Sequence, residues 1–165
     1  MADTKLNRKQ ILAGVGAAGI AAALASPASA LAAGDSGVTG TWLLTVKTSG
    51  AGAPPPSLNL VSFAAGGVVV VVNSTDQQPR TRGTAQLGAW EANGDDFRAK
   101  VLQFALDNSG NPVAIVRVSP VGERDPGSDS IHGTFTGTVR DFQGHLLASL
   151  SGTFSGTRVT VDGAD

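Results

Sequence analysis

Residue types that could perform acid–base or metal chemistry are few in this sequence. The chain has two histidines, His132 and His145, and no cysteine. The two histidines do not form a pair with metal-ligand spacing, and no Gly-x-Ser-x-Gly sequence marks a nucleophilic serine. The glycine-rich stretches lack the lysine of a phosphate-binding loop. The sequence therefore predicts no metal, no cofactor and no catalytic residue.

One acidic segment, residues 122–130, is the alternative for a metal site. It contains Glu123, Asp125 and Asp129, whose carboxylates are ligands suited to Ca²⁺. Calcium-binding loops place their ligands in a regular alternation, which this segment lacks. We therefore interpret it as a solvated acidic loop, with calcium binding as the alternative.

Four polar residues occur inside apolar segments, where they could orient a ligand: Asn59, Gln86, Gln103 and Arg117. The pattern leaves their facing open, because their neighbours do not alternate strictly. If they face outward, they are solvated strand residues. If they face inward, they are the few polar groups that fix a ligand in a mostly apolar pocket. Three aromatic residues are the matching candidates for apolar ligand contacts: Trp90, Phe135 and Phe154. For Trp90, core packing is the alternative.

The elements that must position these residues are β-strands. In residues 40–47, Trp42, Leu44 and Val46 share one face, which is the alternation of a half-buried strand. Similar short apolar segments, separated by turn residues, continue along the chain to Arg158. We expect strands at 40–47, 57–63, 68–73, 84–91, 96–106, 113–121, 131–140 and 146–158. This predicts an all-β fold, an antiparallel up-and-down barrel of about eight strands, with an open sandwich as the alternative.

Two strand patterns carry more specific expectations. In residues 96–106 the apolar face switches near Lys100 to Gln103, which predicts a β-bulge there. On the expected inner faces of the last two strands, glycines alternate with Phe135 and Phe154. Such glycines allow a strand to coil and leave room for a cavity.

The first 33 residues have the features of a helical signal peptide with a short linker. Lys5, Arg8 and Lys9 precede an apolar stretch, and an A-x-A signature predicts cleavage after Ala30 or Ala32. The basic pair resembles a twin-arginine signal, although its second residue is Lys9. We expect a secreted protein, extracellular or periplasmic, with a barrel domain at 34–160 and a polar tail at 161–165. No stable membrane insertion is expected after cleavage.

Composition narrows the class of partner. Charged residues make up 15% of the chain and hydrophobic residues 41%, which excludes global disorder. Basic residues cluster only within the first ten positions, so we expect no nucleic-acid partner. The unbroken run from Val68 to Val72 predicts a strand that is covered on both faces or that lies in a contact between copies of the chain.

The motifs at the two ends of the barrel domain resemble those of the calycin and lipocalin superfamily. Gly40-Thr41-Trp42 opens the first strand and Gly156-Thr157-Arg158 ends the last one. The resemblance implies that Trp42 packs under Arg158 where the barrel closes. The expected barrel domain is also similar to small, exported, lipocalin-like barrel proteins of bacteria, which are mostly uncharacterised. The usual helix after the eighth strand and the second, tyrosine-containing motif are absent from this sequence.

Three functions are compatible with these features. The first is an exported barrel that binds a small apolar molecule without catalysis. The second is a cofactor-free cyclase or isomerase that acts by confining its substrate. The third is a structural surface-contact protein whose interior is filled by Phe97, Phe104, Phe135 and Phe154. The sequence favours the first.

Overall fold

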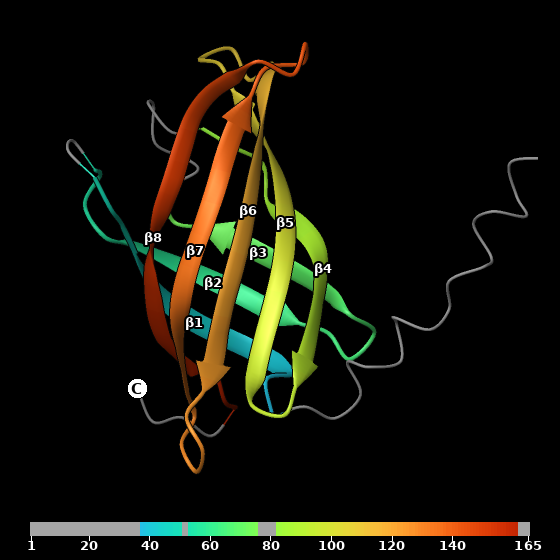
Figure 1. The fold of residues 1–165 in the computed structure, drawn as a ribbon, viewed down its shortest axis with the longest axis vertical. Coiled ribbons are helices and arrows are strands. Elements are labelled where there is room, and N and C mark those ends of the chain that lie inside the picture. Colours follow the sequence, from blue (N-terminus) through green and yellow to red (C-terminus); the bar gives the residue numbers. More distant parts are fainter. Residues whose placement is uncertain (1–36, 51–52, 76–81, 162–165) are drawn as a thin grey trace, which may run out of the picture. The chain divides into compact units, whose positions relative to one another are not determined.

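Each strand pairs in antiparallel fashion with the next one along the chain, and the last strand pairs with the first (Figure 1). The computed structural model describes residues 37–50, 53–75 and 82–161. The predicted all-β, eight-stranded, antiparallel up-and-down barrel is confirmed, and it is consistent with a calycin-like fold. The strands are β1 Gly40–Thr48, β2 Ser57–Phe63, β3 Val68–Asn73, β4 Gln86–Asn93, β5 Asp96–Leu106, β6 Pro112–Arg124, β7 Ser130–Arg140 and β8 Leu146–Arg158.

The predicted signal peptide and linker, residues 1–33, lie outside the described residues, as does most of the predicted polar tail. Throughout the described ranges the regular structure is strand, and they contain no helix long and apolar enough to cross a membrane.

Strand boundaries follow the sequence pattern closely, with two corrections. β4 begins at Gln86 and not at Thr84, although the Thr84 amide still donates a hydrogen bond to the Phe104 carbonyl (3.1 Å). β6 continues to Arg124, so the first part of the predicted acidic loop is strand. It extends this far because Gly122, Glu123 and Arg124 continue the ladder with β7.

The prediction of a β-bulge near Lys100 to Gln103 is wrong. The register between β5 and β6 is continuous through this segment, and its irregularity lies between Ala105 and Leu106. Inward facing continues from Val101 to Gln103, while Phe104 faces outward with 48% of its surface exposed. The sequence misled here because Leu102 and Phe104 are apolar residues on the outer face.

Two tryptophans seal one end of the barrel, which we call the closed end. Trp42 is 0% exposed and its indole nitrogen donates to the Val38 carbonyl (2.8 Å). Trp90 is also buried, and its indole nitrogen donates to the carbonyl of Ala64, in the turn between β2 and β3 (2.8 Å). Each indole therefore fills the core while its single polar group is satisfied by backbone.

Arg158 completes the closed end from the last strand. Trp42 and Arg158 are direct partners in the β1–β8 ladder, and the guanidinium carbon lies 4.2 Å from the centre of the indole ring. The guanidinium also donates to the Thr39 carbonyl (2.6 Å), the Gly37 carbonyl and the Asp129 carboxylate (2.9 Å). The close approach of the guanidinium leaves no room for a Cβ at position 40, where Gly40 has φ 132°. The predicted meeting of Trp42 and Arg158 is thus present.

The valine run forms β3 with two different faces. Val69 and Val71 are buried in the core, whereas Val68 and Val72 are each 51% exposed on the outer face. Val72 pairs with the exposed Leu60 of β2. The prediction that both faces of this strand are covered is therefore wrong for a single chain. Contact between copies of the chain through the outer face of β3 stays a prediction.

The closed end yields a prediction on stability. Trp42→Ala should lower the free energy of unfolding by about 3–5 kcal/mol, because it empties a buried site. Arg158→Ala should cost less, and the double variant should be non-additive by about 0.5–3 kcal/mol, because the two groups are in contact. Denaturant unfolding of the single and double variants measures this coupling.

A matched control combines Trp42→Ala with Arg140→Ala at the opposite end of the barrel. The Arg140 guanidinium donates to the Gly144 carbonyl (2.7 Å) in the turn between β7 and β8. These two changes should add, because the sites share no partner. Additivity in the Trp42 and Arg158 pair as well would contradict a seal made by direct contact.

Candidate functional site

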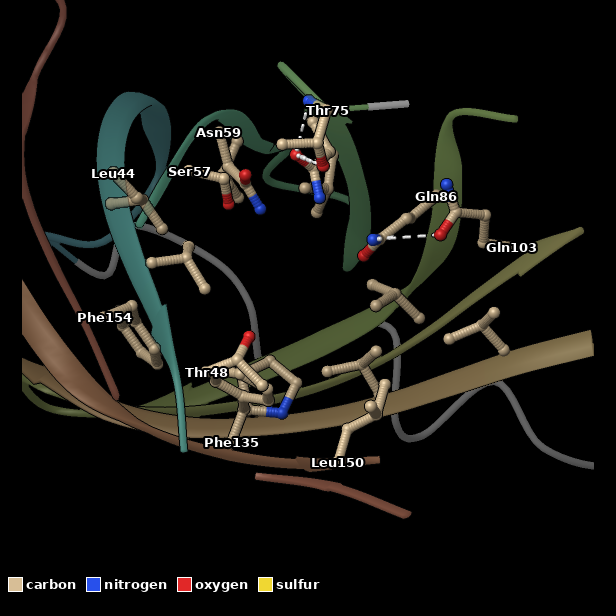
Figure 2. A pocket seen from close by; sticks show the side chains of 18 of the residues that line it. Leu44, Thr48, Ser57, Asn59, Thr75, Gln86, Gln103, Phe135, Leu150 and Phe154 are labelled. Atoms are coloured by element: carbon tan, nitrogen blue, oxygen red, sulfur yellow. Dashed lines mark hydrogen bonds between the residues drawn. The ribbon is translucent and has the colours of Figure 1, made fainter. Parts of the chain in front are cut away.

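The barrel encloses a cavity of about 550 Å³ that extends from the core at the closed end to the opposite end, which we call the open end. The volume lies within the range of about 300–1,000 Å³ typical of small-molecule sites. All eight strands contribute to its wall, and Figure 2 shows part of that wall. The described lining residues are Leu44, Val46, Thr48, Pro54, Pro55, Pro56, Ser57, Asn59, Val61, Phe63, Val69, Val71, Asn73, Thr75, Arg82, Gln86, Phe97, Ala99, Val101, Gln103, Ala105, Leu106, Val116, Val118, Pro120, Phe135, Val139, Leu150 and Phe154.

Three of the four polar candidates face this cavity. Asn59 and Gln86 are each 8% exposed, and Gln103 is half-buried beside Gln86 (Figure 2). The Gln86 amide nitrogen donates to the Gln103 side-chain oxygen (3.4 Å), and the Gln103 amide nitrogen donates to the Thr84 carbonyl (2.6 Å). Side-chain alternation explains the arrangement, because each amide lies in phase with buried apolar residues of its own strand.

Phe135 and Phe154 also line the cavity, but not as the glycine argument predicted. The Phe154 ring covers Gly133, its direct β8–β7 partner, and reaches Gly122 on β6. The Phe135 ring covers Gly152 in the same way. The space above these glycines is therefore occupied by aromatic rings, and the glycines permit close packing of the wall. The open volume lies beside the rings.

Two predicted candidates lie elsewhere. Arg117 is exposed on the outer face of β6, between the cavity-lining Val116 and Val118. Trp90 packs edge-on against Phe63, with ring centres 5.0 Å apart, and is not among the cavity-lining residues. Trp90 was predicted either to contact a ligand or to pack in the core, and in the structure it packs in the core.

The open end is bordered by loops. The three prolines at 54–56 line the cavity there. Arg82 reaches the same rim, and its guanidinium donates to the Asn108 carbonyl (3.0 Å). Arg82 is the only charged side chain in the described lining. The cavity wall is otherwise neutral within that set.

The β5–β6 turn that holds Asn108 is stabilised by Asp107. The Asp107 carboxylate accepts hydrogen bonds from the backbone nitrogens of Asn111 (2.9 Å) and Ser109 (2.8 Å). The hydrogen bond from the Asn111 backbone, with that from its side chain, lowers the pKa of Asp107 below its usual 3.8. This contribution to stability is therefore present above pH 3.8 and is lost as the pH falls through the lowered pKa.

The histidines and the acidic residues lie outside the cavity. His132 contacts Glu123 (3.0 Å) and Asp125 (3.2 Å) on the outer face, while Asp129 is bonded to Arg158. Of the three carboxylates predicted as a calcium alternative, Glu123 and Asp125 therefore share His132, while Asp129 pairs with Arg158. His145 contacts Asp141 (2.8 Å) in the β7–β8 turn. In the described ranges, no group of three or more histidine, aspartate or glutamate side chains is arranged to hold a metal ion.

Ser130 contacts the cluster formed by His132, Glu123 and Asp125. Its Oγ donates to the Asp125 carboxylate, and the serine is not bonded to His132. A nucleophilic serine needs the histidine as its direct hydrogen-bond partner, with the carboxylate behind the histidine. The order of contacts here is different, so this cluster is a surface network.

Asn73 and Arg82 are among the cavity-lining residues that sequence reasoning did not identify. Asn73 lies in phase with Val69 and Val71, so the period-two pattern could have identified it. Arg82 lies outside the named strands, and no local pattern indicates its position at the rim.

Comparison with known proteins gave no relative: no family model, no curated protein and no solved structure matches this chain.

The packing of rings on glycines can be tested by adding one methyl group. Gly133→Ala should lower the free energy of unfolding by about 1–3 kcal/mol, because its Cβ would collide with the Val121 carbonyl and the Phe154 ring. Gly66→Ala is the control, because a Cβ at that turn position meets nothing within 4 Å. Denaturant unfolding measures both changes. Equal effects of the two substitutions would show that Phe154 does not need the glycine.

Proposed function

We propose that this barrel binds a small, largely apolar molecule in its interior. The observation that carries the proposal is the cavity of about 550 Å³, walled mainly by apolar side chains with a few amide groups. Binding sites for small molecules combine these two features, because apolar contact supplies affinity and polar groups fix orientation. The described lining contains one titratable side chain, Arg82 at the rim, which favours capture over acid–base chemistry.

A filled interior is the competing proposal, and the packing argues against it. Three of the four phenylalanines expected to fill the barrel do face inward, yet the cavity persists beside them, and Phe104 lies outside. Protein interiors normally contain few voids larger than a water molecule. Apolar surface left facing water costs about 25 cal/mol per Å², which a bound apolar ligand would recover. The cavity therefore supports the binding proposal.

We also propose that the protein is an exported, lipocalin-like barrel. The support is the signal-peptide pattern of residues 1–33, together with a barrel whose closed end joins Trp42 to Arg158. Contact between copies through the exposed outer face of β3 belongs to the same proposal. It rests on the apolar pair Leu60 and Val72.

Binding can be tested with one cavity-filling variant. Val116→Trp on the inner face of β6 should weaken binding of the fluorescent probe phenylnaphthylamine by at least roughly tenfold, because the indole occupies the cavity. Native mass spectrometry of protein from its own host should also show a small apolar adduct, which the variant lacks.

Val121→Trp is the matched control, because Val121 is an exposed valine on the outer face of the same strand. It should bind the probe as the unmodified protein does. Failure of the unmodified protein to bind apolar probes, or equal losses in both variants, would leave the binding proposal without support.

Export predicts the mass of the mature chain. Protein recovered from the culture supernatant should begin at residue 31 or 33, as measured by intact-mass spectrometry. Ala30 is the last residue of one cleavage signature and the first of the other, so Ala30→Arg should block both sites. Ala33→Arg serves as the control. Full-length protein retained inside the cell would contradict export.

A further inference from the structure

One buried polar atom in the cavity wall has an unused hydrogen-bonding capacity. Asn59 lies on β2 between Leu44 of β1 and Asn73 of β3, and only 8% of its surface is exposed. Its side-chain oxygen is buried and accepts no hydrogen bond within the described residues. A buried acceptor without a donor costs about 1–3 kcal/mol. A group entering the cavity could satisfy it, because Asn59 lines that space.

Of the other amide oxygens in the described wall, those of Asn73 and Gln103 already accept hydrogen bonds. The Asn73 side-chain oxygen accepts hydrogen bonds from the Thr75 backbone (3.0 Å) and hydroxyl (2.8 Å). Gln86 donates to Gln103, and Gln103 donates to the Thr84 carbonyl. Asn59 therefore offers a more available acceptor than Asn73 or Gln103 within the described wall.

The wall around Asn59 combines amides with apolar side chains. Figure 2 shows Asn59, Gln86 and Gln103 on one side of the space, and Phe135, Leu150 and Phe154 on the other, where Thr48 also lies. A ligand that fits both sides needs an apolar body and a polar group directed to one edge. Because the unpaired buried atom of Asn59 is its side-chain oxygen, the complementary group is a hydrogen-bond donor.

Charge restricts that donor further. No carboxylate occurs in the described lining, so a buried ammonium group would have no counter-ion. A ligand carboxylate would find the Arg82 guanidinium only at the rim, whereas Asn59 is buried in the wall. A neutral hydroxyl meets the requirement without burying a charge.

We propose that the ligand is a neutral apolar alcohol whose hydroxyl donates to the Asn59 side-chain oxygen. This inference rests on the proposed binding function and adds the chemical class of the ligand. The apolar body packs against Phe135, Leu150 and Phe154, and Asn59 selects for the hydroxyl.

The experiment uses three ligands with the same chain: decanol, decyl methyl ether and decanoic acid. Each displaces phenylnaphthylamine from the unmodified protein, from Asn59→Leu and from Arg82→Gln. Decanol should bind roughly tenfold more tightly than the ether to the unmodified protein, as expected for one hydrogen bond to a buried acceptor. Asn59→Leu should remove this preference and retain ether binding, while Arg82→Gln should leave the preference intact. If Asn59→Leu does not fold, Asn59→Val replaces it, since valine suits a strand.

The outcomes separate the inference from the binding function on which it rests. If the unmodified protein does not bind the probe, both fail. If the probe binds but decanol and the ether compete equally, the inference fails and the binding function stands. The inference also fails if the preference for decanol survives in Asn59→Leu. Preferential binding of decanoic acid that depends on Arg82 would overturn it in favour of a carboxylate held at the rim.

Discussion

The pairing of β1 with β8 is the constraint on which the rest of the barrel depends. A meander of eight strands has two edges with unpaired backbone groups, and the β1–β8 ladder removes both. The register of this ladder also places Arg158 directly beside Trp42. A guanidinium on an indole face contributes about 0.5–2 kcal/mol, and the hydrogen bonds of Arg158 tie the segment before β1 to the same point. The same β1–β8 ladder therefore closes the sheet and brings together the two residues that close the barrel end.

Sealing one end determines where space can remain. The indoles of Trp42 and Trp90, with Phe63 and Phe97, fill the closed end, and the cavity extends from this core toward the open end. The phenylalanine rings of β7 and β8 occupy the space above glycines of neighbouring strands, where a Cβ would collide with them. Aromatic residues at one end and small residues under the rings allow a stable core and an open interior to coexist in one small barrel.

Polar chemistry is distributed unevenly over this framework. Several ionisable groups of the described residues pair with one another on the outside, as His132 does with Glu123 and Asp125. The described cavity wall combines neutral amides and hydroxyls with apolar side chains. In a space of low polarity, a neutral amide can orient a ligand without the desolvation cost of a buried charge. This distribution supports the proposed binding of a small, largely apolar molecule.

The sequence by itself determined the strand order and most strand boundaries, because period-two alternation and turn residues act locally. The meeting of Trp42 and Arg158 was implied by the resemblance of the motifs at the two ends of the barrel domain. The sequence could not determine the facing of Gln103, since the apolar Leu102 and Phe104 on the outer face imitate a change of phase. It also could not separate a cavity from filled space, because whether glycines leave a gap depends on which rings cover them from other strands. Only the tertiary structure decided that Asn59 faces the interior with its oxygen unpaired. Burial of that atom is the joint result of three neighbouring strands, and no short stretch of sequence contains it.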